Sequence, residues 1–369
     1  MTTRENILRA LTGGPHEFMP ISVVIDNFNY PSGIPGDFNM PGILDFSDYN
    51  ECIRLNKYLG GDMIYRLTPS AVKTRCQNTS YRSERSGPGQ LTDIWDTPHG
   101  QLKALREESH TAKTTYNAYF PIQSMDDYDA LADIVMDYAC ELDSGNIKKA
   151  ADIISAVGDN GVAFTSLPSS PIMDIMRTWA GVAGFIYHLA DDPGRIEALL
   201  QLMEERCMEY AKLVVEHSPC KALVFWDDAN SLYLSPDMFM KYSIPFMKRY
   251  AELAHAHDKI LVCHTCGTIK AFSELFLETG VDAVDWVAPW PIGDIVPKEL
   301  SRIWDGKLTM MLSMQPDILQ NGTPEDCAAH AEKLLEGVDP LGRIIFMVTA
   351  PAGSPMENVK AAISRLRAI

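Results

Sequence analysis

The chain alternates short apolar runs with longer amphipathic stretches, and this alternation repeats eight times along its 369 residues. Each apolar run stops at a polar residue, a glycine or a proline, and most stretches between the runs are long enough for a helix. Such alternation is typical of a parallel sheet covered by helices, and eight strands predict a (β/α)8 barrel. The predicted strands are residues 21–25, 62–67, 162–167, 222–226, 259–263, 283–287, 308–312 and 344–348.

The stretches between the runs carry signals for helix starts. Ser235, Thr323 and Ser354 each precede a proline, which predicts an N-cap followed by proline at the first helical position. The interval of residues 68–160 is longer than the others and predicts a hairpin-like insertion plus helices over the barrel mouth, within a single domain of residues 1–369. The predicted helices are residues 48–59, 191–217, 236–257, 269–279, 324–335 and 355–366.

Composition excludes several classes of protein. The net charge of −17 repels phosphate backbones and anionic membranes, so we expect neither a nucleic-acid partner nor a membrane partner. No apolar run reaches the roughly 18 residues of a membrane span, and the first residues lead directly into a helical pattern, so we expect a cytoplasmic protein. The 8 cysteines are scattered, which favours reduced thiols over a disulfide framework.

Two metal-ligand residues follow the fifth predicted strand, where the chemistry of such barrels is found. Period-two alternation places His264 on the same face as Ile260 and Val262, and continued alternation keeps Cys266 on that side. An imidazole and a thiolate at this spacing suit zinc, and Gly267 permits a tight turn. The alternative is structural, with His264 bonded to a carbonyl and Cys266 buried as a small apolar residue.

A zinc site needs a third ligand, and the ends of the other strands supply candidates. Asp228 is the best of them, because adjacent acids that end an apolar run are costly unless they are bonded. Its neighbour Asp227 is expected to hold a backbone or histidine contact close to the substrate. Another acidic strand end is Asp285.

Aromatic residues near the strand ends are candidates for the wall of a substrate pocket. Phe28 and Tyr30 lie in a loop rich in Pro, Gly and Asn, where core packing explains large rings less well. Trp226, in the fourth predicted strand, is a further candidate. Trp286 lies inside an apolar run, so we expect it to pack in the barrel.

These motifs resemble the uroporphyrinogen decarboxylase superfamily, and within it the corrinoid-dependent methyltransferase branch. The similarity is carried by residues 4–11, 225–228, 234–236, 264–267 and 354–359. The resemblance implies a (β/α)8 barrel and a zinc ion held by Asp228, His264 and Cys266. The thiol-methylating members have a further cysteine after the last strand, which residues 348–354 lack. The spacing of Asp228, Ser243 and His264 matches the zinc ligands of ether-cleaving members, with Asp and Ser in place of two Glu residues.

The resemblance implies a methyltransferase that moves a methyl group between a small methylated substrate, of aryl ether, amine or thiol type, and the cobalt of a separate corrinoid protein. No Asp-x-His-x-x-Gly motif for cobalamin occurs in the chain, so the corrinoid is expected on the partner, which would dock near residues 68–160. The sequence leaves open whether the protein forms a homodimer.

Two alternatives remain at this point. A decarboxylase-like lyase acting on a small carboxylated substrate would need a cationic anchor, for which Arg66 and Arg177 are the candidates. Porphyrinogen itself fits poorly, because residues 25–31 after the first strand contain no arginine and the chain is acidic. The second alternative is a barrel without catalysis that serves as a binding component.

Overall fold

A computed structural model describes residues 1–25, 30–44, 47–109 and 115–369. The internal contacts divide the chain into two compact units. The first unit consists of Met1–Ser70, Gly145–Ser166 and His217–Ile369, and the second of Ala71–Ser144 and Leu167–Glu216. Each unit is described by itself. No helix in the described ranges is long and apolar enough to cross a membrane.

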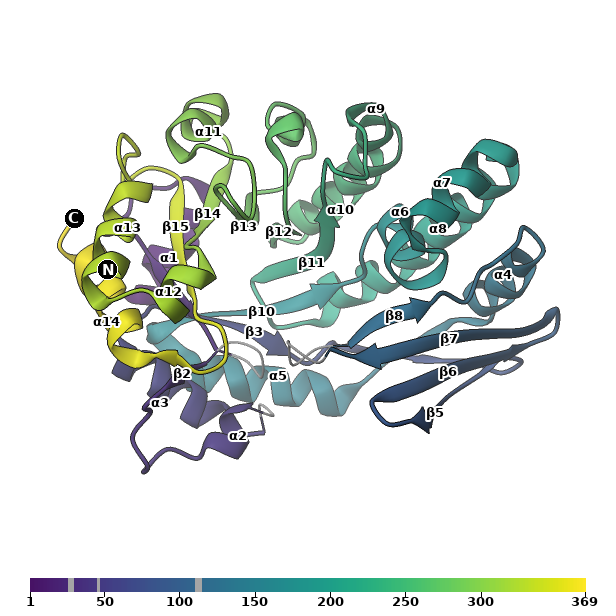
Figure 1. Ribbon diagram of the computed structural model, residues 1–369, viewed down its shortest axis with the longest axis horizontal. Helices are drawn as coiled ribbons and strands as arrows, with labels where there is room; N and C mark the ends of the chain where they lie inside the picture. Colours follow the sequence, from purple (N-terminus) through teal and green to yellow (C-terminus); the bar gives the residue numbers. More distant parts are fainter. Residues whose placement is uncertain (26–29, 45–46, 110–114) are drawn as a thin grey trace. The chain divides into compact units, whose positions relative to one another are not determined.

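The first unit is a nearly closed barrel of eight parallel strands surrounded by helices, which confirms the predicted (β/α)8 fold (Figure 1). The strand order in the sheet is β1-β15-β14-β13-β12-β11-β10-β3, and the main-chain bond from Asp62 N to Ile21 O brings the two outer strands together. All eight predicted strands are confirmed: β1 (Ile21–Val24), β3 (Met63–Thr68), β10 (Gly161–Leu167), β11 (Ala222–Ala229), β12 (Ile260–Thr265), β13 (Ala283–Val287), β14 (Thr309–Ser313) and β15 (Ile344–Thr349).

The barrel interior is filled by alternate residues of the strands, as the pleat of a strand requires. On β12, Ile260 and Val262 point inward, and helix α1 (Thr3–Thr12) adds Ile7 and Leu11 to the same core. Thr2 and Glu5 form a capping box at the start of this helix. Most inward positions near the amino ends of the strands are therefore apolar. Thr309 at the start of β14 is an exception, and its hydroxyl donates to the carbonyls of Ala10 and Leu11 on α1.

Most predicted helices are confirmed within a few residues. They are α3 (Tyr49–Leu59), α8 (Pro193–His217), α10 (Ile244–Ala256) after the short α9 (Pro236–Met238), α13 (Pro324–Leu334) and α14 (Met356–Arg367). A π-helical turn, η3 (Phe239–Ser243), interrupts the predicted helix 236–257. The structure also contains α5 (Ser144–Val157), which lies in the interval 68–160 where helices were expected. Two further short helices, α11 (Pro297–Trp304) and α12 (Pro316–Asn321), were not predicted.

Two predictions about helices are wrong. Residues 269–279 do not form an α-helix but two 3-10 turns, η4 (Lys270–Phe272) and η5 (Leu275–Glu278). Ser354 does not cap a helix, because Ser354–Pro355 forms the short strand β16, which pairs with β2 (Pro31–Ser32). The caps at Ser235 and Thr323 are confirmed, since each hydroxyl accepts a bond from a backbone N–H three residues later.

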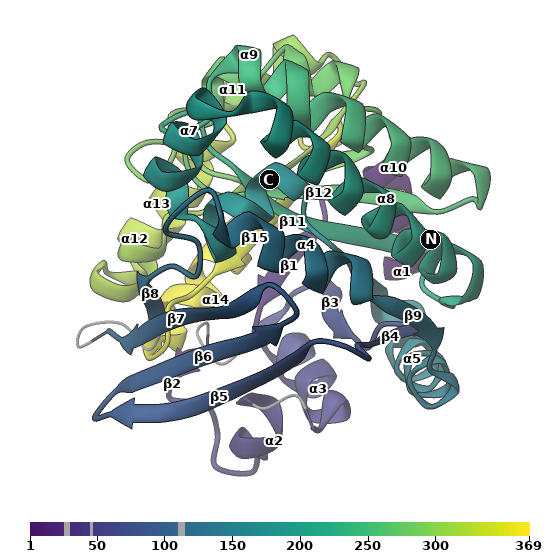
Figure 2. The ribbon, with the colours of Figure 1, turned by 90° about the vertical axis from the view of Figure 1, so that its right-hand side faces the viewer.

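The second unit contains an antiparallel sheet of four consecutive strands, β5 (Ser80–Gly87), β6 (Gln90–Thr97), β7 (Gly100–Glu108) and β8 (Thr115–Tyr119) (Figure 2). A separate pair joins β4 (Val72–Arg75) to β9 (Ala139–Leu142). Its helices are α4 (Asp127–Asp137), α6 (Pro171–Asp174), α7 (Gly181–Asp191) and α8, with the π-helical turn η2 (Ile175–Trp179). The predicted hairpin-like insertion is thus a four-stranded meander, and its place over the barrel mouth stays a prediction.

Candidate active site

His264 lies at the carboxyl end of β12 with only 12% of its side chain exposed, and each of its ring nitrogens faces a carboxylate. Nδ1 lies 2.9 Å from Oδ2 of Asp285, and Nε2 lies 3.5 Å from Oδ1 of Asp228. The three residues come from β11, β12 and β13, which are neighbours in the sheet. The structure therefore brings together two of the three predicted metal ligands, His264 and Asp228.

Irregular backbone on both sides of β12 directs side chains toward His264. The pairing register shifts between Trp226 and Ala229 on β11 and between Val284 and Val287 on β13. Within these bulges Asp228 has φ 52° and Trp286 has φ 61°, both in the left-handed region that non-glycine residues avoid. Bulges next to active sites commonly re-aim a side chain. Here they place a carboxylate and an indole ring around one imidazole.

Asp285 is fully buried and is paired with Arg66, which reaches it from β3. Arg66 binds the carboxylate through both Nη atoms, and the bond from Nη2 to Oδ1 is 3.0 Å long. Burial alone would raise the pKa of Asp285, but the charge of Arg66 and the bond to His264 hold that pKa well below its usual range. Asp285 is therefore an anion inside the barrel mouth.

Two indole rings flank the histidine. The ring of Trp226 lies 4.7 Å from that of His264, centroid to centroid, and its Nε1 donates to Oγ of Ser166 at 3.0 Å. The ring of Trp286 lies 6.1 Å from His264 on a tilted plane. Both tryptophans also pack against the barrel core, as predicted for Trp286, and the role of Trp226 in a pocket wall stays a prediction.

Cys266 lies outside this cluster. It is exposed in the loop after β12, and its carbonyl accepts a 3.0 Å bond from Nδ2 of Asn230. Gly267 beside it has φ 111°, and a Cβ there would lie 2.1 Å from the same Nδ2, so only glycine fits. Among the residues that the structure describes, no group of three or more His, Cys, Asp and Glu side chains is arranged to hold a metal ion.

Asp227 has no exposed surface, and it follows the inward residue Trp226 on β11. Alternation directs it to the outer side of the strand, behind the site. The neighbouring thiol of Cys263 is also fully buried, and burial, together with the negative charge of Asp227, raises the pKa of Cys263 well above its usual value. The substrate contact expected of Asp227 stays a prediction.

The loop after β1 joins the loop after β15 at the same end of the barrel. The carbonyl of Tyr30 accepts a 2.9 Å bond from the backbone N–H of Gly353, next to the pair of short strands β2 and β16. Tyr30 is thus anchored at the carboxyl ends of the strands, and its role in a substrate pocket stays a prediction. Phe28 lies outside the described residues.

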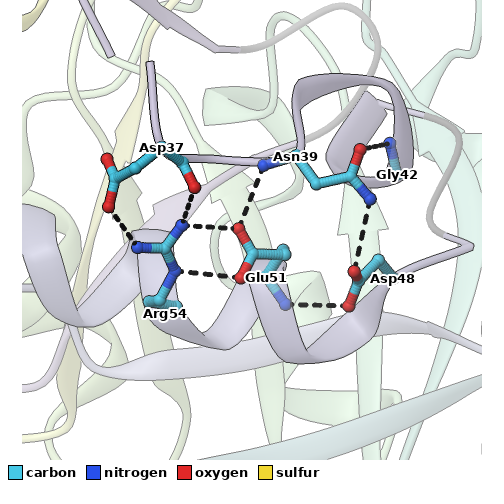
Figure 3. Close-up of polar contacts among 6 residues, drawn as sticks. All are labelled: Asp37, Asn39, Gly42, Asp48, Glu51 and Arg54. Atoms are coloured by element: carbon cyan, nitrogen blue, oxygen red, sulfur yellow. Dashed lines mark hydrogen bonds and ion pairs between the residues drawn. The ribbon is translucent and has the colours of Figure 1, made fainter. Parts of the chain in front are cut away.

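A polar network fixes the segment that follows this loop (Figure 3). Arg54 on α3 donates to Oδ2 and to the carbonyl of Asp37 at 2.9 and 2.7 Å, and it binds both carboxylate oxygens of Glu51. The backbone N–H of Asn39 donates to Glu51 at 3.1 Å, and Asp48 caps α3 through the N–H of Glu51. The network ties Asp37, Asn39 and Asp48 to the first turns of α3.

The pairing of Arg66 with Asp285 is the functional feature that the sequence did not show. The sequence marks each residue only separately, Asp285 as an acidic strand end and Arg66 as a candidate anion anchor. The sequence signal for such a pair is a charged residue at an inward position of an otherwise apolar strand, because a charged residue is rarely buried without a partner. The sequence does not identify the partner, because β3 and β13 are far apart in the chain.

Comparison with known proteins shows which family the chain resembles. Residues 114–369 match the family model described as uroporphyrinogen decarboxylase (URO-D). The methylcobamide:CoM methyltransferases MtbA of Methanosarcina mazei and Methanosarcina acetivorans are each 26% identical over 141 residues, which is 38% of this chain and 40% of each relative. The match thus spans less than half the length of these relatives.

A solved structure extends the similarity of fold over nearly the whole chain. A methyltransferase from Methanosarcina mazei superimposes with a TM-score of 0.62 at 16% identity and covers 99% of this chain and 98% of its own. This agreement concerns the fold. Because the family model matches more than half of the chain, the protein belongs to the uroporphyrinogen decarboxylase (URO-D) family.

Proposed function

We propose that the protein is a corrinoid-dependent methyltransferase that moves a methyl group between a small methylated substrate and the cobalt of a separate corrinoid protein. The observation that carries the proposal is His264, whose Nε2 faces the carboxylate of Asp228 at the mouth of the barrel. Support also comes from the MtbA relatives, which are methylcobamide:CoM methyltransferases. Substrates of aryl ether, amine and thiol type are all consistent with the proposal.

Two of the three proposed zinc ligands fit that role. Two ligands that each lie 2.0–2.1 Å from one tetrahedral zinc ion stand roughly 3.3 Å apart, and the separation of His264 Nε2 from Asp228 Oδ1 is 3.5 Å. Asp285 occupies Nδ1 of His264, as a carboxylate does for many metal-bound histidines. Cys266 is the proposed third ligand, and its exposed side chain would have to turn toward His264.

The chemistry of this site follows from its residues. A bound zinc ion would act as a Lewis acid on the heteroatom that releases the methyl group, or would lower the pKa of a thiol acceptor. The rings of Trp226 and Tyr30 would exclude water and orient the methyl-bearing group. In such a transfer the heteroatom would keep the electron pair of the carbon–heteroatom bond that breaks, and cob(I)alamin on the partner would supply the electron pair for the new cobalt–carbon bond.

The lyase alternative has less support. It needs a cation that is free to bind a carboxylate substrate, and Arg66 already binds the carboxylate of Asp285 through both Nη atoms. Arg177, the other candidate, belongs to the second compact unit, and His264 belongs to the first.

A screen with a corrinoid protein in the cob(I)alamin state tests the proposal. Methylated ethers, amines and thioethers are added one at a time, and the absorbance of methylcobalamin is followed; the reverse reaction uses methylcobalamin and thiols. We expect one substrate class to react and His264→Ala to lose about 100-fold in rate or more. His255→Ala is the matched control, since His255 pairs with Asp282 at the amino ends of the strands. No reaction in either direction would contradict the proposal.

A further inference from the structure

We infer that Asp285 and Arg66 are positioning residues, which together fix the tautomer and the orientation of His264. The inference rests on the proposed function only in assigning Nε2 as the atom that binds the metal. The positioning itself rests on contacts within the barrel unit.

Asp285 determines which ring nitrogen of His264 carries the proton. Asp285 is fully buried and its carboxylate forms a two-point ion pair with Arg66, so its Oδ2, at 2.9 Å from Nδ1 of His264, accepts a hydrogen bond. Nδ1 therefore carries the proton. In the neutral ring this leaves the lone pair on Nε2, which is the nitrogen that faces Asp228.

Arg66 holds the carboxylate of Asp285 in place. Oδ2 of Asp285 binds both His264 and Nη1 of Arg66, and Oδ1 binds Nη2 of Arg66 at 3.0 Å. A two-point pair with a planar guanidinium prevents the carboxylate from rotating. Arg66 comes from β3, which is not a neighbour of β13 in the sheet, so the pair spans the interior of the barrel. The orientation of His264 thus depends on a strand that does not touch β12.

Two indole rings restrict the plane of the imidazole ring. Trp226 and Trp286 flank the imidazole at 4.7 and 6.1 Å, which limits rotation about its side-chain bonds. Because Nδ1 is bonded to Asp285 and the ring plane is restricted, the lone pair of Nε2 points in one direction, toward Asp228. Outer contacts of this kind typically change metal affinity by 10–100-fold.

Asp285→Asn separates positioning from a purely structural role. Arg66 and His264 are both donors, so the asparagine amide NH2 group would oppose one of them and the ring would lose its fixed tautomer. The matched control is Asp282→Asn, which breaks the 2.9 Å contact of Asp282 with His255 at the other end of the barrel. Arg66→Gln is a second variant, which leaves Asp285 in place and removes only the guanidinium that binds its carboxylate.

The first measurement is a long-range nitrogen–proton NMR spectrum of histidine-labelled protein without metal, near pH 8, where free imidazole is neutral. We expect His264 to carry its proton on Nδ1 in the wild type and in Asp282→Asn, and to populate both tautomers in Asp285→Asn and in Arg66→Gln. The second measurement is the zinc dissociation constant, which we expect to rise by about 10–100-fold in the same two variants.

Unchanged tautomer and unchanged zinc affinity in both folded variants would overturn the inference. A changed tautomer in a protein whose wild type binds no zinc would support positioning and contradict the proposed zinc chemistry. The two failures are therefore distinguishable.

Discussion

Asp228 combines an unfavourable backbone with a favourable side-chain position. Its φ of 52° places it in the left-handed region, where aspartate and asparagine are tolerated far better than residues without a short polar side chain. The residue thus meets two separate demands, one of backbone conformation and one of charge. Substitutions can separate them.

We expect Asp228→Asn to keep the free energy of unfolding within about 0.5 kcal/mol of the wild type and to lose zinc affinity, because an amide is a weaker ligand than a carboxylate. Asp228→Ala should lose a further ~1–2 kcal/mol through its backbone. Asp258→Asn is the control, since Asp258 has φ 54° and lies before the amino end of β12. Urea unfolding and zinc titration measure the two effects. Equal zinc affinity of Asp228→Asn and wild type would remove Asp228 from the ligand set.

Asp137, in the second unit, gives a prediction for low pH. Burial alone would raise the pKa of Asp137, but bonds from the backbone and side chains of Asn78 and Thr79 lower it to about 2. Because the folded pKa lies below the unfolded value near 3.9, its stabilisation is complete above about pH 4 and is lost as the pH falls toward 2. We therefore expect the stability difference between wild type and Asp137→Asn to shrink over that range in urea unfolding. A constant difference would contradict the assignment.

At the scale of elements, the loop after β12 depends on the loop after β11. Asn230 bonds the carbonyl of Cys266, accepts a bond from the hydroxyl of Thr268 at 2.8 Å, and leaves no space for a Cβ on Gly267. The backbone N–H of Ser231 adds a 2.8 Å bond to the carbonyl of Thr268. The position of Cys266 is therefore set by a neighbouring loop.

We expect Gly267→Ala to lower the free energy of unfolding by about 2 kcal/mol, because it adds a clash with Asn230 to the strain of a positive φ. Gly33→Ala is the control for strain alone, since Gly33 has φ 76° and nothing lies within 4 Å of the position that a Cβ would take there. Urea unfolding compares the two variants. Equal free energies of unfolding in the two variants would show that the Asn230 side chain moves aside at little cost.

The failed helix at residues 269–279 has a physical cause in tertiary contacts. The backbone N–H groups of Ile269 and Lys270 both donate to Oδ1 of Asp294, and the carbonyl of Ser273 accepts a 2.8 Å bond from Nε1 of Trp304. These partners lie outside the segment. The periodicity of the sequence predicted a helix, whereas side chains from later in the chain supply bonds that favour shorter turns.

For the whole molecule, a ligand that binds only the folded state raises its stability. Zinc at about 100 times its dissociation constant adds about 2.7 kcal/mol, which we expect to raise the midpoint of thermal unfolding of a 369-residue chain by roughly 3–4 °C. A chelator should reverse the rise. We expect zinc to leave the unfolding midpoint of His264→Ala unchanged and to raise that of His255→Ala as in the wild type. A rise of equal size in His264→Ala would place the zinc elsewhere.

The sequence by itself determined the barrel and the strand from which each candidate ligand comes. All eight strands were predicted because apolar runs that end at polar residues report burial directly, and His264, Asp228 and Trp226 followed from their places at strand ends. Tertiary structure alone decided which of these side chains meet. The left-handed backbones of Asp228 and Trp286, the pair between Arg66 and Asp285, and the exposed position of Cys266 all depend on contacts between distant segments, which local sequence patterns do not encode.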